Sequence, residues 1–219
     1  MQTQALGTRS TLETNKLIRS TYTLLSMTLL FSAAMAGLSI MLGTPYMIGL
    51  VANLVGIGLL WFVLPKTANS AAGIGVVFAF TGLLGFGLGP ILAHYLAMPN
   101  GGQTVMMAMG GTGAIFLGLS GYALTSRRDF SFMGGFLAVG MIVVVLAMLA
   151  NLFFQVPAVS LAMSAAIVLL MSGFILYETS QMVHGHVDNY IVMTTSLFLS
   201  IINLFQSLLM LLGFAGGDD

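Results

Sequence analysis

Seven long apolar stretches dominate this sequence and limit what it can fold into. They cover residues 22–42, 46–64, 72–93, 104–125, 132–154, 158–182 and 190–214. A helix needs roughly 20 apolar residues to cross about 30 Å of hydrocarbon, and each stretch is close to that length or longer. The strands of a transmembrane barrel would instead alternate in segments of about ten residues, and such alternation is weak here. The sequence therefore predicts an all-α integral membrane protein, a bundle of seven transmembrane helices.

The composition excludes several other classes of protein. Hydrophobic residues make up 58% of the chain and charged residues 5%, whereas a soluble domain carries about a quarter charged residues. A formal net charge of zero provides no basic surface for phosphates, which argues against a nucleic-acid partner. The chain has no cysteine, so disulfides, thiolate metal sites and cysteine nucleophiles are excluded. We expect no cofactor and no metal site.

The six Lys and Arg residues set the expected orientation in the membrane. Three precede the first apolar stretch, one follows the second and two follow the fourth, so seven spans place all six on one side. The positive-inside rule assigns that side to the cytoplasm. We expect a cytoplasmic N-terminal tail over residues 1–21, a membrane domain over 22–214 and a short periplasmic C-terminal tail over 215–219. A re-entrant last helix would instead leave the C-terminus in the cytoplasm.

Glu178 is the one acidic or basic residue well inside an apolar stretch. Ionisable residues inside a membrane are costly, so they are the first candidates for function. Glu178 lies toward the C-terminal end of its expected helix, where the helix dipole also disfavours a negative charge. The side chain must be protonated, reach water or pair with a cation. Candidate partners on the same side include Arg127, Arg128 and His184.

The last apolar stretch carries a polar stripe that could face this carboxyl. The stripe consists of Ser196, Ser200, Asn203 and Ser207, which recur at the three- and four-residue spacing of one helix face. We predict a functional polar cluster of Glu178, Ser200 and Asn203. The alternative is that Glu178 extends to interfacial water and that the stripe only joins neighbouring helices.

Glycines are concentrated in the third and fourth apolar stretches. The segment TGLLGFGLGP over residues 81–90 resembles a phosphate-binding loop only superficially, because it lies inside an apolar helix with no preceding strand. Small residues allow close approach of helix backbones in a membrane, so we expect these glycines to serve packing. Pro90 predicts a kinked or interrupted helix.

Several segments resemble one family of multispan proteins. They are LLGFGLGPIL at 83–92, AMGGTGAIF at 108–116, YALTSRRDFSFMGGFL at 122–137, ILYETSQMV at 175–183 and LFLSIINLFQSLL at 197–209. In this order they resemble the Bax inhibitor-1 (TMBIM) family over nearly the whole chain after residue 20. The resemblance implies a seven-helix bundle with six helices around a central one. For some members it also implies a pH-sensitive calcium leak through a pair of acidic residues on the last two helices.

The sequence departs from the family pattern at this acidic pair. The resemblance aligns the first acid with Glu178 and the second with Ser200, so the second carboxylate is missing. Two close carboxylates can share a proton, which one carboxylate and a hydroxyl cannot do. A single carboxylate also compensates poorly for the charge of Ca²⁺.

Three functions follow as hypotheses. The pattern is most similar to bacterial inner-membrane members of the family, which implies modulation of the membrane-bound ATP-dependent protease FtsH, as inhibitor or competing substrate. The expected partners are FtsH, its associated membrane proteins and the lipid bilayer. The alternative is a calcium or proton leak pathway. A third hypothesis, an intramembrane serine protease, depends on Ser120 in the segment GLSG with His184 or His186 as base. We expect binding and no catalytic residue.

Overall fold

The computed structural model describes residues 11–216, and every regular element in that range is helical. The elements are α1 (Thr11–Met41), α2 (Tyr46–Gly58), the π-helical turn η1 (Leu59–Val63), α3 (Leu64–Thr67), α4 (Ala71–Leu96), α5 (Gly101–Ser126), α6 (Met133–Phe154), α7 (Pro157–Val183) and α8 (Tyr190–Ala215). Together they form seven helical rods that are long and apolar enough to cross a membrane. The predicted all-α, seven-span fold is confirmed.

The second rod joins α2, η1 and α3 without a break. Pro65 has no N–H, and in a regular α-helix its ring would clash with the carbonyl of Trp61, four residues earlier. The π-helical turn removes this conflict, because the amide of Leu64 bonds to the carbonyl of Leu59, five residues back. The helix therefore continues to Thr67, beyond the apolar stretch that predicted it.

The first helix begins at Thr11, inside the segment that we expected to be a tail. Leu17 and Thr21, one turn apart, are buried, and Leu17 packs in a cluster with Met193 and Leu197 of α8. Hydropathy could not indicate this extension of α1, because the residues on the side of the helix that faces away from α8 are polar. Residues 1–10 of the expected tail lie outside the described residues.

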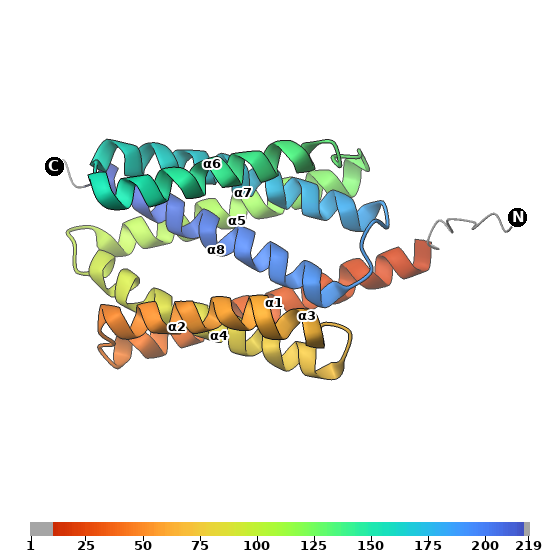
Figure 1. The fold of residues 1–219 in the computed structure, drawn as a ribbon, viewed down its shortest axis with the longest axis horizontal. Helices are drawn as coiled ribbons and strands as arrows, with labels where there is room; N and C mark the ends of the chain where they lie inside the picture. Colours follow the sequence, from red (N-terminus) through yellow and green to blue (C-terminus); the bar gives the residue numbers. More distant parts are fainter. Residues whose placement is uncertain (1–10, 217–219) are drawn as a thin grey trace, which may run out of the picture.

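The helices form two groups with α8 between them (Figure 1). α1, α2 and α4 pack together on one side of α8, and α5, α6 and α7 pack together on the other. α8 contacts α1, α4, α5 and α7, so it is the central helix of the bundle. Within residues 11–216, α2 and α6 do not contact α8; each lies on the outside, against α4 and α7 respectively.

α4 is continuous through Pro90, so the predicted interruption does not occur. A Cβ added at Gly49 of α2 would lie 2.9 Å from the Pro90 ring, which shows that the proline fits against a glycine of the neighbouring rod. Protein surrounds this part of the helix, as is typical where a membrane helix tolerates proline.

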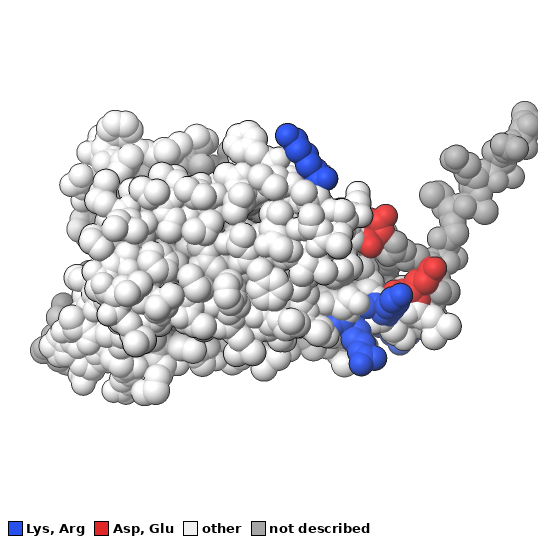
Figure 2. All heavy atoms as spheres, turned by 90° about the horizontal axis from the view of Figure 1, so that it is seen from below, with Lys and Arg blue, Asp and Glu red and all other residues white. Residues whose placement is uncertain are grey.

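Charged residues gather at one end of the molecule. Figure 2 shows Lys, Arg, Asp and Glu near that end on the visible face, with an uncharged surface beyond. The described residues outside the core that carry these charges are Glu13, Lys16, Arg19, Lys66, Arg127, Arg128, Asp129 and Asp188. Between the ends, large apolar side chains such as Leu30, Trp61 and Phe136 are more than two-thirds exposed. This surface is suited to lipid. α8 ends at Ala215, at the opposite end, where residues 11–216 carry no charged side chain; we call this the uncharged end.

Candidate functional site

Glu178 is buried between α7 and α8, toward the charged end of the bundle. Its side chain is 6% exposed. Ser196 donates a hydrogen bond to one carboxylate oxygen, Oε1. The Ser200 hydroxyl lies 3.1 Å from Oε2 and 3.3 Å from Oε1. The two serines are four residues apart on α8, so both hydroxyls face the same neighbour. The structure thus brings Glu178 and Ser200 together, with Ser196 as a third member.

The structure does not bring Asn203 to the carboxylate. Its amide nitrogen donates to the carbonyl of Leu199 over 2.8 Å, and the side chain is exposed. The spacing from Ser196 predicted a shared face, but α8 crosses the bundle obliquely (Figure 1). One face of such a helix meets different surroundings along its length.

The three expected cationic partners do not pair with Glu178. Among residues 11–216, the polar contacts of its carboxylate come from the two serines. The ring nitrogens of His184 instead face the carbonyl oxygens of Ser180, at 2.9 Å, and of Arg127, at 3.1 Å. The Ser180 hydroxyl also donates to the carbonyl of Arg128 over 3.2 Å. Arg127, Arg128 and His184 therefore belong to a backbone connection between the α5–α6 turn and the end of α7.

A second polar layer lies beside Glu178 and joins three helices. The hydroxyl of Thr179 on α7 lies 3.3 Å from that of Tyr22 on α1 and 3.3 Å from that of Ser120 on α5. Sequence reasoning missed Tyr22 and Thr179, because no local spacing relates them. The only signal was that Thr179 follows Glu178 directly.

Ser120 is buried, and its described hydrogen-bond partner is the Thr179 hydroxyl. A hydroxyl cannot act as the general base that a serine nucleophile requires. The histidines that we considered as bases are placed elsewhere: His184 contacts the α5–α6 turn, and His186 contacts Gln181 and Ser131. Within residues 11–216, neither histidine is a hydrogen-bond partner of Ser120, so the serine–histidine pair of that hypothesis is not formed.

The α5–α6 turn also carries an ordered carboxylate outside the spans. The hydroxyl of Ser131 donates to Asp129 over 2.5 Å, and the amide of Ser131 donates to the same oxygen over 2.8 Å. These two hydrogen bonds hold the pKa of Asp129 below its ordinary value, because they stabilise the charged form.

The donor set around Glu178 is a poor match for a metal ion. In the described part of the chain, no three His, Asp or Glu side chains come together in a way that could hold one. Ca²⁺ takes six to eight oxygen ligands with several carboxylates among them, whereas this cluster offers one carboxylate and two hydroxyls. The arrangement is suited to joining α7 and α8.

Comparison with known proteins gives the family. The family model described as inhibitor of apoptosis-promoting Bax1 matches residues 14–217. The modulator of FtsH protease YccA from Escherichia coli strain K12 is 50% identical over 211 residues, which are 95% of this chain and 94% of that protein. An uncharacterized membrane protein from Vibrio cholerae is 48% identical over 219 residues, covering 100% of this chain and 98% of the relative. A protein named inner membrane protein YccA, from E. coli O6:H1, is 50% identical over 211 residues. With seven apolar rods and a match over almost its full length, this chain is a multi-pass membrane protein of the Bax inhibitor-1 family.

Proposed function

We propose that this protein is an inner-membrane modulator of the protease FtsH, acting as inhibitor or competing substrate. The observation that carries the proposal is the 50% identity, over 95% of the chain, to a protein named modulator of FtsH protease. The match also covers 94% of that relative, so the two chains correspond along nearly their whole lengths.

We infer that the protein acts by binding and not by catalysis. The hydroxyl of Ser120 is paired with that of Thr179, and the carboxylate of Glu178 is enclosed by serine hydroxyls. Both groups are buried. Their contacts join helices, and this favours a stable bundle that presents its outer surface to a partner.

We also propose an orientation of the protein in the membrane. The N-terminus and the charged end are placed in the cytoplasm by the positive-inside rule, and the end of α8 at Ala215 then lies on the periplasmic side. C-terminal fusions to reporters that are active on only one side of the membrane test this arrangement. Activity of the cytoplasmic reporter alone would contradict it.

The decisive experiment measures degradation of a membrane substrate by FtsH in proteoliposomes, with and without this protein at equimolar ratio. The proposal predicts a severalfold slower degradation when the protein is present, and recovery of FtsH when the protein is captured in mild detergent. Unchanged degradation together with no captured FtsH would contradict the proposal. An unrelated seven-helix protein in the same vesicles controls for crowding of the membrane.

The polar N-terminal segment is the expected point of engagement by the protease, because it has few apolar residues and an unfolding protease must grip an exposed segment. Deleting residues 2–10 leaves α1, Lys16 and Arg19 in place. The deletion should lengthen the lifetime of the protein in cells with active FtsH. An unchanged lifetime would remove this segment as the handle without affecting the inhibition assay.

The family's leak function predicts a different result. Calcium entry into proteoliposomes that contain this protein should not depend on pH, because the acidic pair is reduced to Glu178 with Ser200. The variant Ser200→Asp restores a second carboxyl and is the matched positive test. Strong pH-dependent entry in the parent, lost in Glu178→Gln, would support the leak function instead.

A further inference from the structure

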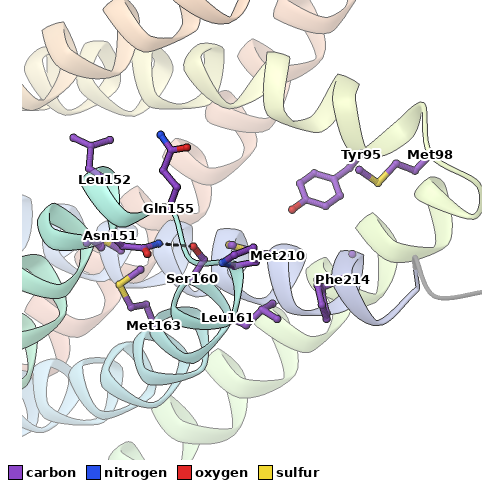
Figure 3. Close-up of a pocket in the computed structure, with 13 residues that line it drawn as sticks. Tyr95, Met98, Asn151, Leu152, Gln155, Ser160, Leu161, Met163, Met210 and Phe214 are labelled. Carbon is purple, nitrogen blue, oxygen red and sulfur yellow. Dashed lines mark hydrogen bonds between the residues drawn. The ribbon is translucent and has the colours of Figure 1, made fainter.

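A cleft of about 810 Å³ lies at the uncharged end of the bundle, between the two groups of helices. The end of α4 forms one wall, the α6–α7 turn forms the other, and the end of α8 forms the floor (Figure 3). In the described residues, α4 contacts neither α6 nor α7. The cleft is therefore open between the two groups.

The lower part of the cleft reaches the depth of the hydrocarbon. α6 has 22 residues, about 33 Å of helix, so its ends lie near the boundaries of a hydrocarbon layer of about 30 Å. Met148 on α6 and Met163 on α7 both line the cleft. Each is six residues from the end of its helix at the α6–α7 turn, or about 9 Å into the bundle.

The lining is mixed at the rim, where polar and apolar side chains alternate, and mainly apolar at the bottom. Leu161, Met163 and Met210 line the apolar part, and no charged side chain of residues 11–216 lines the cleft. At the rim, Figure 3 shows the Tyr95 hydroxyl directed into the space toward the α6–α7 turn, where Gln155 is located. Neither the Tyr95 hydroxyl nor the Gln155 amide is among the described side-chain hydrogen bonds of residues 11–216. Asn151 and Ser160 also line the cleft, but they are bonded to each other. The hydrogen-bonding groups left for an occupant therefore lie at the rim, where an amphiphile would place its polar part.

The walls are held in position by their own hydrogen bonds. The amide nitrogen of Asn151 donates to the Ser160 hydroxyl over 2.8 Å, and its oxygen accepts from the amide of Val156 over 2.9 Å. The Ser164 hydroxyl donates to the sulfur of Met210 over 3.1 Å. These contacts fix the α6–α7 turn and the floor without an occupant.

The side chains in the cleft favour a flexible occupant over a helix. Helix contacts in membranes use small residues that let two backbones approach, and here the small residues are already covered. A Cβ at Gly213 would overlap the Tyr95 ring, and Ser160 is bonded to Asn151. Methionines, by contrast, adapt their shape to irregular apolar partners.

We propose that this cleft binds one phospholipid, with an acyl chain in its apolar part and the ester-linked glycerol region at Tyr95 and Gln155. Because no cationic side chain in the described part of the chain lines the cleft, a lipid with a net-neutral headgroup binds at least as well as an anionic one. The proposal is independent of the interaction with FtsH.

The test is mass spectrometry of the intact protein released from mild detergent after reconstitution with phosphatidylethanolamine or phosphatidylglycerol. One phosphatidylethanolamine per chain should be retained. Leu161→Trp fills the cleft and should reduce the retained fraction about tenfold. The matched control is Leu169→Trp on the same helix, at a side chain that is 75% exposed and outside the cleft; it should retain lipid as the parent does.

A second variant keeps the test valid if Leu161→Trp does not fold. Tyr95→Phe removes only the hydroxyl at the rim and should lower retention about two- to tenfold, the effect of one hydrogen bond. Equal retention in the parent, Leu161→Trp and Tyr95→Phe would overturn the proposal, and so would exclusive retention of phosphatidylglycerol. A co-purifying polypeptide segment in place of lipid would overturn it in favour of helix docking.

Discussion

The two groups of helices beside α8 are held together in different ways. In the group of α1, α2 and α4, glycines of α4 lie directly against neighbouring helices. A Cβ at Gly85 would overlap the backbone of Ser32 on α1, and a Cβ at Gly87 would overlap the side chain of Asn53 on α2. A Cβ at Gly82 would lie 2.6 Å from the Phe31 ring. Because these glycines have no side chain, the helices of this group can pack closely against one another.

The group of α5, α6 and α7 is held at the charged end by side-chain hydrogen bonds. Ser180 accepts a bond from the amide of Phe130 over 3.0 Å and donates to the carbonyl of Arg128. The glycines of α5 have a different role from those of α4. A Cβ at Gly110, Gly113, Gly118 or Gly121 would meet nothing within 4 Å.

The comparison shows that glycine content alone does not indicate a packed interface. Helices α4 and α5 are both rich in glycine, and we predicted packing for both. The prediction holds for Gly82, Gly85, Gly87 and Gly89 of α4 and not for these four positions of α5. Substitutions in the first group should therefore disturb the fold most, and substitutions at the open glycines least.

Gly85→Ala should have the largest effect. The added Cβ falls on the backbone carbonyl of Ser32, so α1 and α4 must separate, at a cost of about 3 kcal/mol or more. Thermal unfolding in mild detergent should show a large loss of stability or no folded protein. The control is Gly75→Ala on the same helix, where nothing lies within 4 Å. Equal stability of both variants would contradict the close packing of the first group.

Glu178→Leu should have the next largest effect, at the contact of the second group with α8. It leaves the buried hydroxyl of Ser200 and that of Ser196 without their acceptor, which costs about 1–3 kcal/mol. Glu178→Gln keeps an oxygen acceptor at nearly the same position and should cost less than about 1 kcal/mol. Denaturant unfolding of both variants measures the difference. A large loss for Gln, similar to that for Leu, would mean that the negative charge itself is needed and that a cation pairs with the carboxylate.

Ser180→Ala should weaken the second group more locally. It removes two hydrogen bonds to the α5–α6 turn, worth about 1–2 kcal/mol together. Hydrogen exchange at the amide of Phe130 should become faster. Ser172→Ala is the control, because that hydroxyl bonds only within α7, to the carbonyl of Val168. Unchanged exchange at Phe130 would show that the turn is held by other contacts.

The boundaries of most spans could be predicted from the sequence, because apolar runs end at polar residues, glycine or proline. α6 was expected over residues 132–154 and covers Met133–Phe154. The start of α1 was not predictable in this way. Leu17 and Thr21 pack against α8 beyond the apolar run, and hydropathy does not report a helix that continues past the bilayer.

The sequence could predict those features of the candidate site that depend on the residue spacing within a single helix. Glu178 stands out as a charge in an apolar run, and the spacing of Ser196 and Ser200 puts both on one face. The contacts among Tyr22, Thr179 and Ser120 join α1, α7 and α5. No spacing within the chain gives the relative positions of three helices, so these contacts required the structure.

Gly118→Ala should leave the fold intact. It tests whether the open glycines of α5 tolerate a side chain that the packed glycines of α4 do not. The added methyl group meets nothing within 4 Å, and alanine favours helix over glycine by up to about 1 kcal/mol. The unfolding temperature should stay the same or rise slightly. A marked loss of stability would show that α5 is covered by a second molecule in the membrane.

Ser131→Ala should have the smallest effect, confined to the exposed α5–α6 turn. The hydroxyl of Ser131 is the largest cause of the lowered pKa of Asp129, followed by its amide, so the substitution should raise that pKa toward its ordinary value. A carboxylate with a lowered pKa in the folded state contributes stability above its unfolded pKa, and this contribution is lost as the pH falls through the folded pKa. The variant should therefore lose a little of its stability near neutral pH and show a weaker dependence on acid. A carbon-13 NMR titration of the Asp129 carboxyl measures the shift, with Ser126→Ala in the same turn as control, since that hydroxyl contacts the amide of Arg128. An unchanged titration would mean that the backbone amide of Ser131 alone orders the carboxylate.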